Sequence, residues 1–119
     1  MRPHKDRNIG RYYLFESERI GFGIWNKEDL EKAKELWGDN EVTKYIGGPF
    51  SIDIIEARLR LEIENQNKFQ IQYWPIFLKI DGAFIGCCGL RPYKNNFKIL
   101  ETGFHLCRRY WGKGYATIR

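Results

Sequence analysis

The spacing of the apolar residues changes once along this chain, near residue 70, and this change constrains the fold more than any other feature. Before it, Ile55, Leu59 and Ile63 recur every four residues, which predicts a helix with one apolar face. After it, apolar residues alternate with their neighbours over residues 73–80, which predicts a strand. A chain that changes from helical to strand spacing is typical of an α+β fold.

Two helices are expected before the change, with a strand in front of them. Residues 20–25 predict a short first strand. Asn26 is a typical N-cap for the helix that follows, and Gly38 is placed to end it. Ser51 can cap the second helix, whose pattern fades in the polar run 64–68. The core residues expected from this part are Trp37, Tyr45, Ile55, Leu59 and Ile63.

An antiparallel meander of three strands is expected after the change. Asp81-Gly82 is a strong signal for a two-residue turn that joins the strands 73–80 and 83–90. A second turn, over residues 91–97, leads into a third strand at residues 98–107. One face of the strand 73–80 is expected to carry Ile76, Leu78 and Ile80, while Glu101, Gly103, His105 and Cys107 share one face of the third strand.

The composition is that of a single globular domain. Of the 119 residues, 43% are hydrophobic and 29% are charged, which excludes a disordered polymer, a collagen-like fibre and a disulfide scaffold. The apolar runs fall far short of the ~20 residues that a membrane helix needs. Residues 1–13 are expected to form a basic arm without a secretory signal, and residues 14–119 a single domain. We therefore expect a cytoplasmic protein without a membrane partner.

The positive charge is concentrated at one end of the chain. Residues 91–119 hold seven Lys or Arg and one acid, a balance of +6 within a total of +5, so residues 1–90 carry −1. A basic segment of this kind indicates an anionic partner, which could be a nucleic acid, a membrane surface or a phosphorylated cofactor.

The three cysteines predict free thiols in a reducing compartment, because their number is odd and no signal peptide precedes them. Cys87 and Cys88 are adjacent and would face opposite sides of a strand. A zinc site from Cys87, Cys88, His105 and Cys107 is conceivable, but the spacing matches no recognised motif. Buried apolar cysteines are the better interpretation, and no metal is expected.

The pattern Arg109-x-x-Gly112-x-Gly114 lies between the last strand and an expected helix start. Glycines allow a tight turn that brings backbone N–H groups toward a ligand, and a helix N-terminus adds further donors. With Arg109 and Lys113 beside them, these groups predict a pocket for a phosphate or diphosphate. The pattern differs from the dinucleotide fingerprint, since Thr117 stands at the third glycine position, and from the nucleotide-hydrolase loop.

The run Arg109-Tyr-Trp-Gly-Lys-Gly-Tyr-Ala116 resembles the acyl-CoA signature of the GNAT superfamily of N-acetyltransferases. With the following Thr, it resembles the branch that includes ribosomal-protein N-terminal acetyltransferases. The resemblance covers about residues 17–117, and the loop is its most specific part. Further matching segments are Glu18-Arg19-Ile20, residues 39–48, Ile85-Gly86 and Glu101-Thr-Gly-Phe104.

This resemblance implies acetyl-CoA as co-substrate and a primary amine, either a protein N-terminus or a small amine, as acceptor. It implies that the loop holds the diphosphate and that the strand end at 105–107 pairs with the pantetheine arm, where one backbone N–H polarises the thioester carbonyl. Glu101 is the first candidate for the base that deprotonates the amine, and His105 is the second. The cofactor-binding residues implied are Leu106, Cys107, Arg109, Trp111, Gly112, Lys113, Gly114, Tyr115 and Ala116.

The resemblance also implies an incomplete GNAT fold, because family members continue with a further strand, a helix and a tyrosine often assigned as the thiol acid. Plainer roles remain open: a strand glutamate paired with a basic residue for Glu101, and a hydrogen-bonded strand histidine for His105. Two other functions are alternatives. One is a non-catalytic fragment that self-associates through the edge of the strand 98–107. The other, less favoured, is a nucleic-acid binder that stacks bases on Tyr93, Phe97, Tyr110, Trp111 and Tyr115.

Overall fold

The structure, a computed structural model, describes residues 11–93 and 96–114, without the side chains at positions 93, 96 and 97. The expected helix start after the glycine loop therefore lies outside the described residues. The elements in chain order are β1 (Phe15–Glu16), β2 (Ile20–Phe22), the 3₁₀ turn η2 (Lys27–Asp29), α1 (Leu30–Trp37), α2 (Asn40–Thr43), α3 (Ile52–Phe69), β3 (Tyr73–Leu78), β4 (Phe84–Tyr93), β5 (Asn96–Leu106) and the 3₁₀ turn η3 (Arg108–Tyr110).

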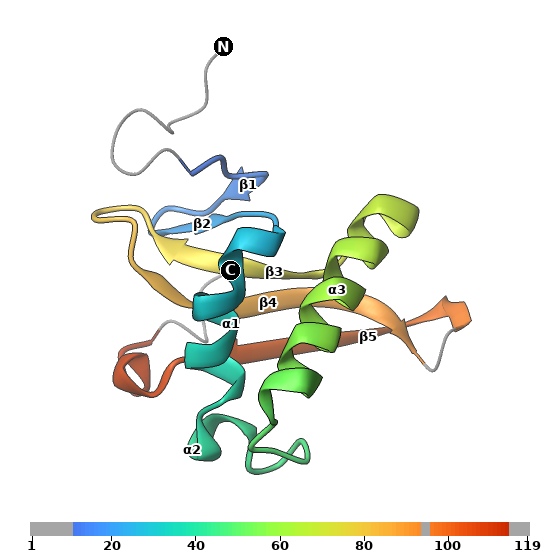
Figure 1. Cartoon of the computed structure of the whole chain (residues 1–119). Helices are drawn as coiled ribbons and strands as arrows, with labels where there is room; N and C mark the ends of the chain where they lie inside the picture. The colour runs from blue at the N-terminus through green and yellow to red at the C-terminus, as the bar shows by residue number, and fades with distance from the viewer. Residues whose placement is uncertain (1–10, 94–95, 115–119) are drawn as a thin grey trace.

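The strands form one antiparallel sheet in the order β1-β2-β3-β4-β5, with α1 and α3 on the same face (Figure 1). This confirms the α+β fold, and β3, β4 and β5 are the expected meander. The two N-terminal strands extend that meander into a five-stranded sheet, in which β5 forms one edge of the described part. A strand edge leaves backbone N–H and C=O groups unpaired, so β5 offers hydrogen-bonding groups to a ligand or another chain.

Two apolar clusters hold the sheet, one on each face. The cluster under the helices contains Trp25, Trp37 and Phe77, all fully buried. The cluster on the opposite face is smaller and is formed by Ile20, Ile76, Ile85 and Leu106. Cys87 belongs to the helix-side cluster and Cys88 packs against the opposite one, as the alternation of a strand requires.

The expected helix starts are confirmed by their caps. The Asn26 side chain accepts from the N–H of Glu28, and its own N–H donates to the carboxylate of Asp29, which closes a capping box at η2. The Ser51 hydroxyl accepts from the N–H of Ile54 at the start of α3. Each cap satisfies a backbone donor that the first helical turn leaves without a partner.

The second of the two expected helices is α3, and it is longer than expected because the polar run 64–68 remains helical. The helix continues to Phe69 and ends at Gln70, which adopts a left-handed conformation with φ 65°. The Gln66 side chain accepts from the indole N–H of Trp74 on the neighbouring strand at 2.9 Å. A contact of this kind from β3 stabilises a helical turn that has no apolar face of its own.

Three local expectations are wrong. The first strand ends at Phe22, before the expected limit at residue 25. Tyr45, expected in the core, is 89% exposed, because the chain between α2 and α3 turns at Gly47 and leaves its ring in solvent. Ile80, expected on the buried face of a strand, is 90% exposed.

Ile80 is exposed because the turn before β4 is wider than two residues. β3 ends at Leu78, which accepts the N–H of Gly82, and the Asp81 carboxylate accepts the N–H of Ala83. Gly82 has φ 76°, so it supplies the left-handed turn conformation. The turn between β4 and β5 is shorter than expected, since paired backbone extends to Tyr93 and Asn96.

Part of the expected N-terminal arm packs against the domain. Residues 1–10 lie outside the described residues. The Tyr13 ring is buried beside Gly21 and Phe77. Arg11 forms an ion pair of 3.0 Å with the buried carboxylate of Asp29. Residues 11–13 therefore contribute to the helix-side core.

Candidate functional site

The glycine loop begins directly after β5 with the 3₁₀ turn η3. In this turn the N–H of Tyr110 donates to the Cys107 carbonyl at 2.9 Å, and the N–H of Trp111 donates to the Arg108 carbonyl at 3.1 Å. These two amides are therefore occupied. They fix the path of the chain into the glycines and do not serve as ligand donors themselves.

Gly112 and Gly114 both have a left-handed backbone, with φ 77° and 83°. A Cβ atom at either position would meet no atom of the described residues within 4 Å, so among these residues only the backbone conformation favours glycine. Among the described residues, no backbone carbonyl accepts the N–H of Gly112 or Lys113. Within the described part of the chain, these two successive loop amides therefore have no backbone acceptor, and their role in anion binding stays a prediction.

The Trp111 side chain connects this loop to the edge of β5. Its indole N–H donates to the carbonyl of Leu106 at 2.8 Å. Beside this contact lies a cavity of about 320 Å³, lined by Val42, Phe104, His105, Leu106, Trp111 and Gly112. The loop and the strand edge therefore border one shared hollow on the surface.

The register of β4 and β5 decides which strand amides face that edge. The N–H of Cys107 donates to the Ile85 carbonyl at 2.8 Å, and Leu106 lies opposite Gly86. In an antiparallel pair this makes Leu106 and Gly86 a non-hydrogen-bonded pair, whose backbone groups point away from each other's strand. Leu106, and by alternation Phe104, present their N–H groups to the open edge, whereas the N–H of Cys107 is used inside the sheet.

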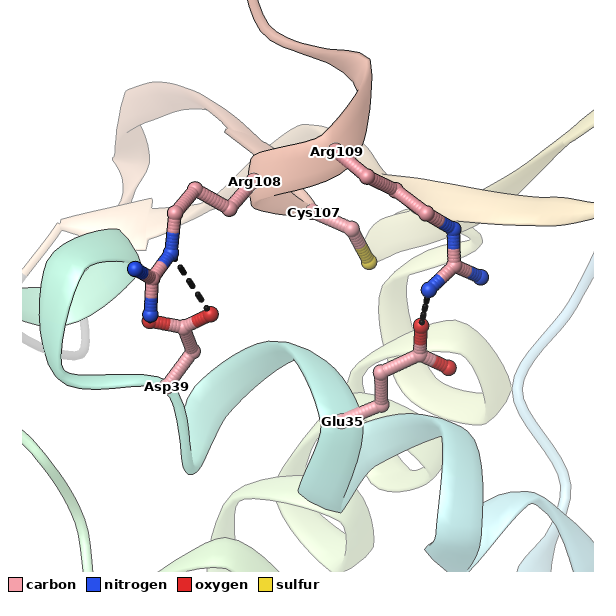
Figure 2. A pocket seen from close by; sticks show the side chains of 5 residues that line it. All are labelled: Glu35, Asp39, Cys107, Arg108 and Arg109. Atoms are coloured by element: carbon pink, nitrogen blue, oxygen red, sulfur yellow. Dashed lines mark hydrogen bonds and ion pairs between the residues drawn. The ribbon is translucent and has the colours of Figure 1, made fainter.

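The two arginines of the loop are tied to the helices by carboxylates (Figure 2). Arg108 binds Asp39, the N-cap of α2, at 2.8 Å, and Arg109 binds Glu35 of α1 at 3.0 Å. The Arg108 guanidinium holds the pKa of the Asp39 carboxyl below its usual value. A cavity of about 380 Å³ lies between the two pairs. As arranged, its formal charges cancel, so the arginines orient the loop and do not form an anion site by themselves.

The Cys107 thiol lines this cavity between the two ion pairs. Burial raises its pKa to about 12, and the neighbouring carboxylate of Glu35 acts in the same direction. Since the thiolate is the reactive form of cysteine, Cys107 is an inert thiol at neutral pH. All three cysteines are free.

His105 lies on the helix-side face of β5, where it is hydrogen-bonded to α1. The Trp37 indole N–H donates to Nδ1 of His105 at 3.0 Å, and the Cys87 sulfur lies 3.7 Å from the same nitrogen. Burial lowers the pKa of His105 to about 4, assisted by the charges of Arg58 and Arg91. With Nδ1 occupied as acceptor, the neutral ring carries its proton on Nε2 and has no free lone pair for a base.

Glu101, the first candidate base, is about one-third exposed and is paired with Arg91 directly opposite it on β4. Arg91 Nε lies 2.8 Å from Glu101 Oε1, and the guanidinium lies over the Tyr73 ring. Six residues separate Glu101 from Cys107, about 20 Å along a strand. The structure therefore places Glu101 on the same strand as the loop entrance but well away from the glycines.

The family of this chain follows from its sequence match. Residues 19–118 match the acetyltransferase (GNAT) domain family. The chain belongs to the GNAT acetyltransferase family. It is 32% identical over 104 residues to the uncharacterized N-acetyltransferase p20 of Bacillus licheniformis, a match that spans 85% of this chain and 58% of p20. It is 29% identical over 82 residues to the uncharacterized protein YkkB of Bacillus subtilis, which covers 68% of this chain and 48% of YkkB.

Solved GNAT-type structures share this fold. The acetyltransferase of Agrobacterium tumefaciens superposes with a TM-score of 0.73 at 23% identity, over 92% of this chain and 66% of that protein. A GNAT-family acetyltransferase of Bacillus anthracis superposes with a TM-score of 0.67 at 22% identity, over 87% of this chain and 58% of that protein. The chain thus spans about half to three-fifths of the length of the curated relatives named above.

Sequence reasoning missed a buried polar network between α3 and the GNAT sheet. The Glu62 carboxylate is fully buried and accepts from Arg58 at 2.7 Å and from the N–H of Tyr73 at 2.8 Å. The Arg58 guanidinium lies over the rings of Trp37 and Tyr73, and its Nη2 is buried without a hydrogen-bond partner among the described residues. A charged pair at i, i+4 within an apolar stripe is a signal that could have identified it.

Two of the predicted cofactor-binding residues cannot be placed. Tyr115 and Ala116 lie outside the described residues. Within the described ranges, no cluster of three or more His, Cys, Asp or Glu residues could hold a metal ion. In the same ranges no helix combines the length and apolar character that crossing a bilayer requires.

Proposed function

We propose that this GNAT domain is part of an N-acetyltransferase that transfers the acetyl group of acetyl-CoA to a primary amine, either a protein N-terminus or a small amine. One observation carries the proposal. Gly112, whose N–H has no backbone acceptor among the described residues, lines one cavity together with Phe104 and Leu106 of the edge strand β5. The loop could bind a diphosphate, and the adjacent strand edge could bind a linear arm that accepts hydrogen bonds from backbone N–H groups.

The diphosphate would bind the loop through backbone amides, which the left-handed conformation of Gly112 would turn toward the ligand. Lys113 adds a formal positive charge at the same place. The pantetheine arm would then run along β5 and accept hydrogen bonds from the outward N–H groups of Leu106 and Phe104. An extended arm of this kind would bridge the distance between the glycine loop and Glu101.

The proposed chemistry is direct attack by the amine. The acceptor arrives as an ammonium group and gives one proton, directly or through water, to the carboxylate of Glu101. The free amine attacks the thioester carbon while an outward backbone N–H of β5 stabilises the oxygen, the C–N bond forms and the C–S bond breaks. The proton that the new amide nitrogen loses goes to the departing CoA sulfur. His105 donates no lone pair and is left with a positioning role.

Calorimetry with acetyl-CoA on the full chain tests this proposal. We expect Gly112→Ala and Gly114→Ala to weaken binding by at least about tenfold, since alanine disfavours the left-handed backbone that aims the amides. Gly47→Ala is the matched control, because Gly47 also has a positive φ of 97° and room for a methyl group, but lies between α2 and α3. Equal affinity in all four proteins would remove the loop from the site.

The assignment to the ribosomal-protein branch and the cytoplasmic location belong to the same proposal. The branch assignment depends on the loop motif. The location depends on the free thiols, which fit a reducing compartment. A protein N-terminus as the acetylated product would support the branch. Mass spectrometry after incubation with acetyl-CoA and peptides of different N-terminal residues would measure it.

Self-association of the same fold is a second candidate, favoured by a specific observation. β5 forms an open edge of the described sheet, and Leu100 and Phe104 on its face are partly exposed. A second copy could pair with this edge and cover both side chains. A clean monomer in sedimentation at high concentration would reject it. The nucleic-acid alternative has less support, because Asp39 and Glu35 neutralise Arg108 and Arg109.

A further inference from the structure

Arg91 and Glu101 form a surface-accessible ion pair on the helix-side face of the sheet. They lie directly opposite each other on β4 and β5, and the bond of 2.8 Å joins Nε of Arg91 to Oε1 of Glu101. The Arg91 guanidinium is held over the Tyr73 ring at 5.5 Å, and both charged side chains are about one-third exposed. Because the bond recorded within the described residues uses Nε, the two Nη groups of Arg91 remain for another acceptor.

The charges around this pair cancel only while Glu101 is ionised. Arg58 and Arg91 lie over the Tyr73 ring, and Glu62 and Glu101 are their partners. In the described part of the chain, the buried Nη2 of Arg58 already has no hydrogen-bond partner. If Glu101 takes up a proton, the group keeps two guanidinium charges against one carboxylate. A half-buried charge without a partner is costly, so a substrate that supplies a negative charge would stabilise this state.

We propose that the acceptor amine carries an anionic group, a carboxylate or a phosphate, which binds the Nη groups of Arg91 while the ammonium group faces Glu101. This inference rests on the proposed function, because it assigns Glu101 the role of base. An acceptor with one positive and one negative end is complementary to the ion pair, because its ammonium group faces Glu101 and its anionic group faces Arg91. It replaces the contact that Arg91 loses when Glu101 becomes protonated.

The geometry favours a short distance between the two ends of the acceptor. Arg91 and Glu101 are cross-strand neighbours, so their charged groups are in direct contact. A guanidinium presents two parallel donors to a carboxylate or phosphate, and stacking on Tyr73 fixes its plane. An amine whose other end is neutral would leave Arg91 beside a protonated Glu101 and would bind less tightly.

Binding of matched small amines tests the inference without relying on activity. The probes are 3-aminopropanoate, its neutral analogue 3-aminopropanamide, and O-phosphoethanolamine against ethanolamine, titrated into the full chain while the Arg91 Nε–H signal is followed by NMR. We expect each anionic amine to bind at least about tenfold more tightly than its neutral analogue, the effect of one charge-assisted hydrogen bond. The probe pair with the larger ratio identifies carboxylate or phosphate as the preferred group.

Variants separate recognition by Arg91 from general attraction. Arg91→Gln should reduce the preference to less than about twofold, and Arg91→Lys should retain part of it. Arg60→Gln, the same charge change at an exposed position of α3, should leave it unchanged. Equal binding within each probe pair, no binding of either anionic amine, or an equal loss in Arg60→Gln would overturn the inference. If the chain binds acetyl-CoA but shows no preference for anionic amines, only this inference is refuted. If it prefers anionic amines but does not bind acetyl-CoA, the proposed transferase function is refuted.

Discussion

The indole N–H of Trp37 donates to Nδ1 of His105 across 3.0 Å, and this contact joins α1 to β5. It fixes the imidazole in the form that carries its proton on Nε2, in a site where burial lowers the pKa to about 4. The histidine nearest the glycine loop is therefore a hydrogen-bonded neutral side chain at physiological pH, the plainer of the two roles that its sequence position allows.

His105 should make the domain less stable in mild acid. In the unfolded chain its pKa is near 6.5, and in the folded chain burial lowers it to about 4. The unfolded state therefore binds the proton first, so this contribution is complete above about pH 6.5 and is lost as the pH falls toward 4. The expected loss is about 3 kcal/mol. Urea unfolding across this pH range measures it, and His105→Asn should lack that part of the slope. Parallel slopes would contradict the depressed pKa.

Trp37→Phe should release the tautomer of His105 while it keeps an aromatic ring in the core. Loss of the N–H removes one buried hydrogen bond, with an expected cost of about 1 kcal/mol plus the change in packing. Long-range proton–nitrogen NMR spectra report which imidazole nitrogen is protonated. We expect a single Nε2–H form in the parent chain and a mixture in the variant. An unchanged spectrum would show that another contact holds the ring.

Substitution of glycine by alanine should destabilise the fold much less in the loop than in the sheet. At Gly112 a methyl group meets open space, so Gly112→Ala should cost only about 1 kcal/mol of stability from its positive φ. At Gly86 a methyl group would collide with the backbone carbonyl of His105, so Gly86→Ala should destabilise the fold by several-fold more, about 3 kcal/mol or above. Thermal unfolding of the two variants measures the difference. Similar losses would mean that strand β4 can shift to admit the methyl group.

The Arg58–Glu62 pair should be strongly coupled. Glu62→Ala leaves a guanidinium charge in a mostly buried site and removes the acceptor of the Tyr73 N–H, with an expected loss of about 3–5 kcal/mol. The double variant Arg58→Met with Glu62→Ala should recover the part of this loss that comes from the unpaired guanidinium, because no charge then remains buried. Denaturant unfolding of both singles and the double gives the coupling energy. Simple additivity would show that the pair acts through packing alone.

Features set by neighbouring residues could be predicted from the sequence, whereas features set by distant contacts could not. The caps at Asn26 and Ser51 depend on short patterns, and the structure shows both of them. The His105 environment depends on Trp37, which lies 68 positions earlier, so no local pattern reports it. The exposure of Tyr45 likewise depends on how the segment after α2 turns, because burial is a property of the whole fold.

The candidate site shows the same division. The glycine loop is a contiguous motif, and Gly112 has the positive φ that a tight glycine turn adopts. The partner of Glu101 was open among several basic residues, because only the register of β4 and β5 places Arg91 opposite it. The carboxylates that hold Arg108 and Arg109 come from helices about 70 residues earlier, which spacing near the loop does not reveal.

The ion pair between Arg109 and Glu35 should compete with the diphosphate of acetyl-CoA. Both side chains are largely exposed, so the pair contributes little to stability, less than about 1 kcal/mol. Glu35→Gln would free the Arg109 guanidinium for a diphosphate at the loop, and we expect acetyl-CoA affinity to rise about threefold at low salt, with a smaller gain at high salt because the attraction is screened. Calorimetry at two salt concentrations measures this. Glu31→Gln, which removes the carboxylate bound to Lys34 on the same helix, is the matched control and should change affinity little. A fall in affinity with Glu35→Gln would instead mean that the pair holds the loop in its binding conformation.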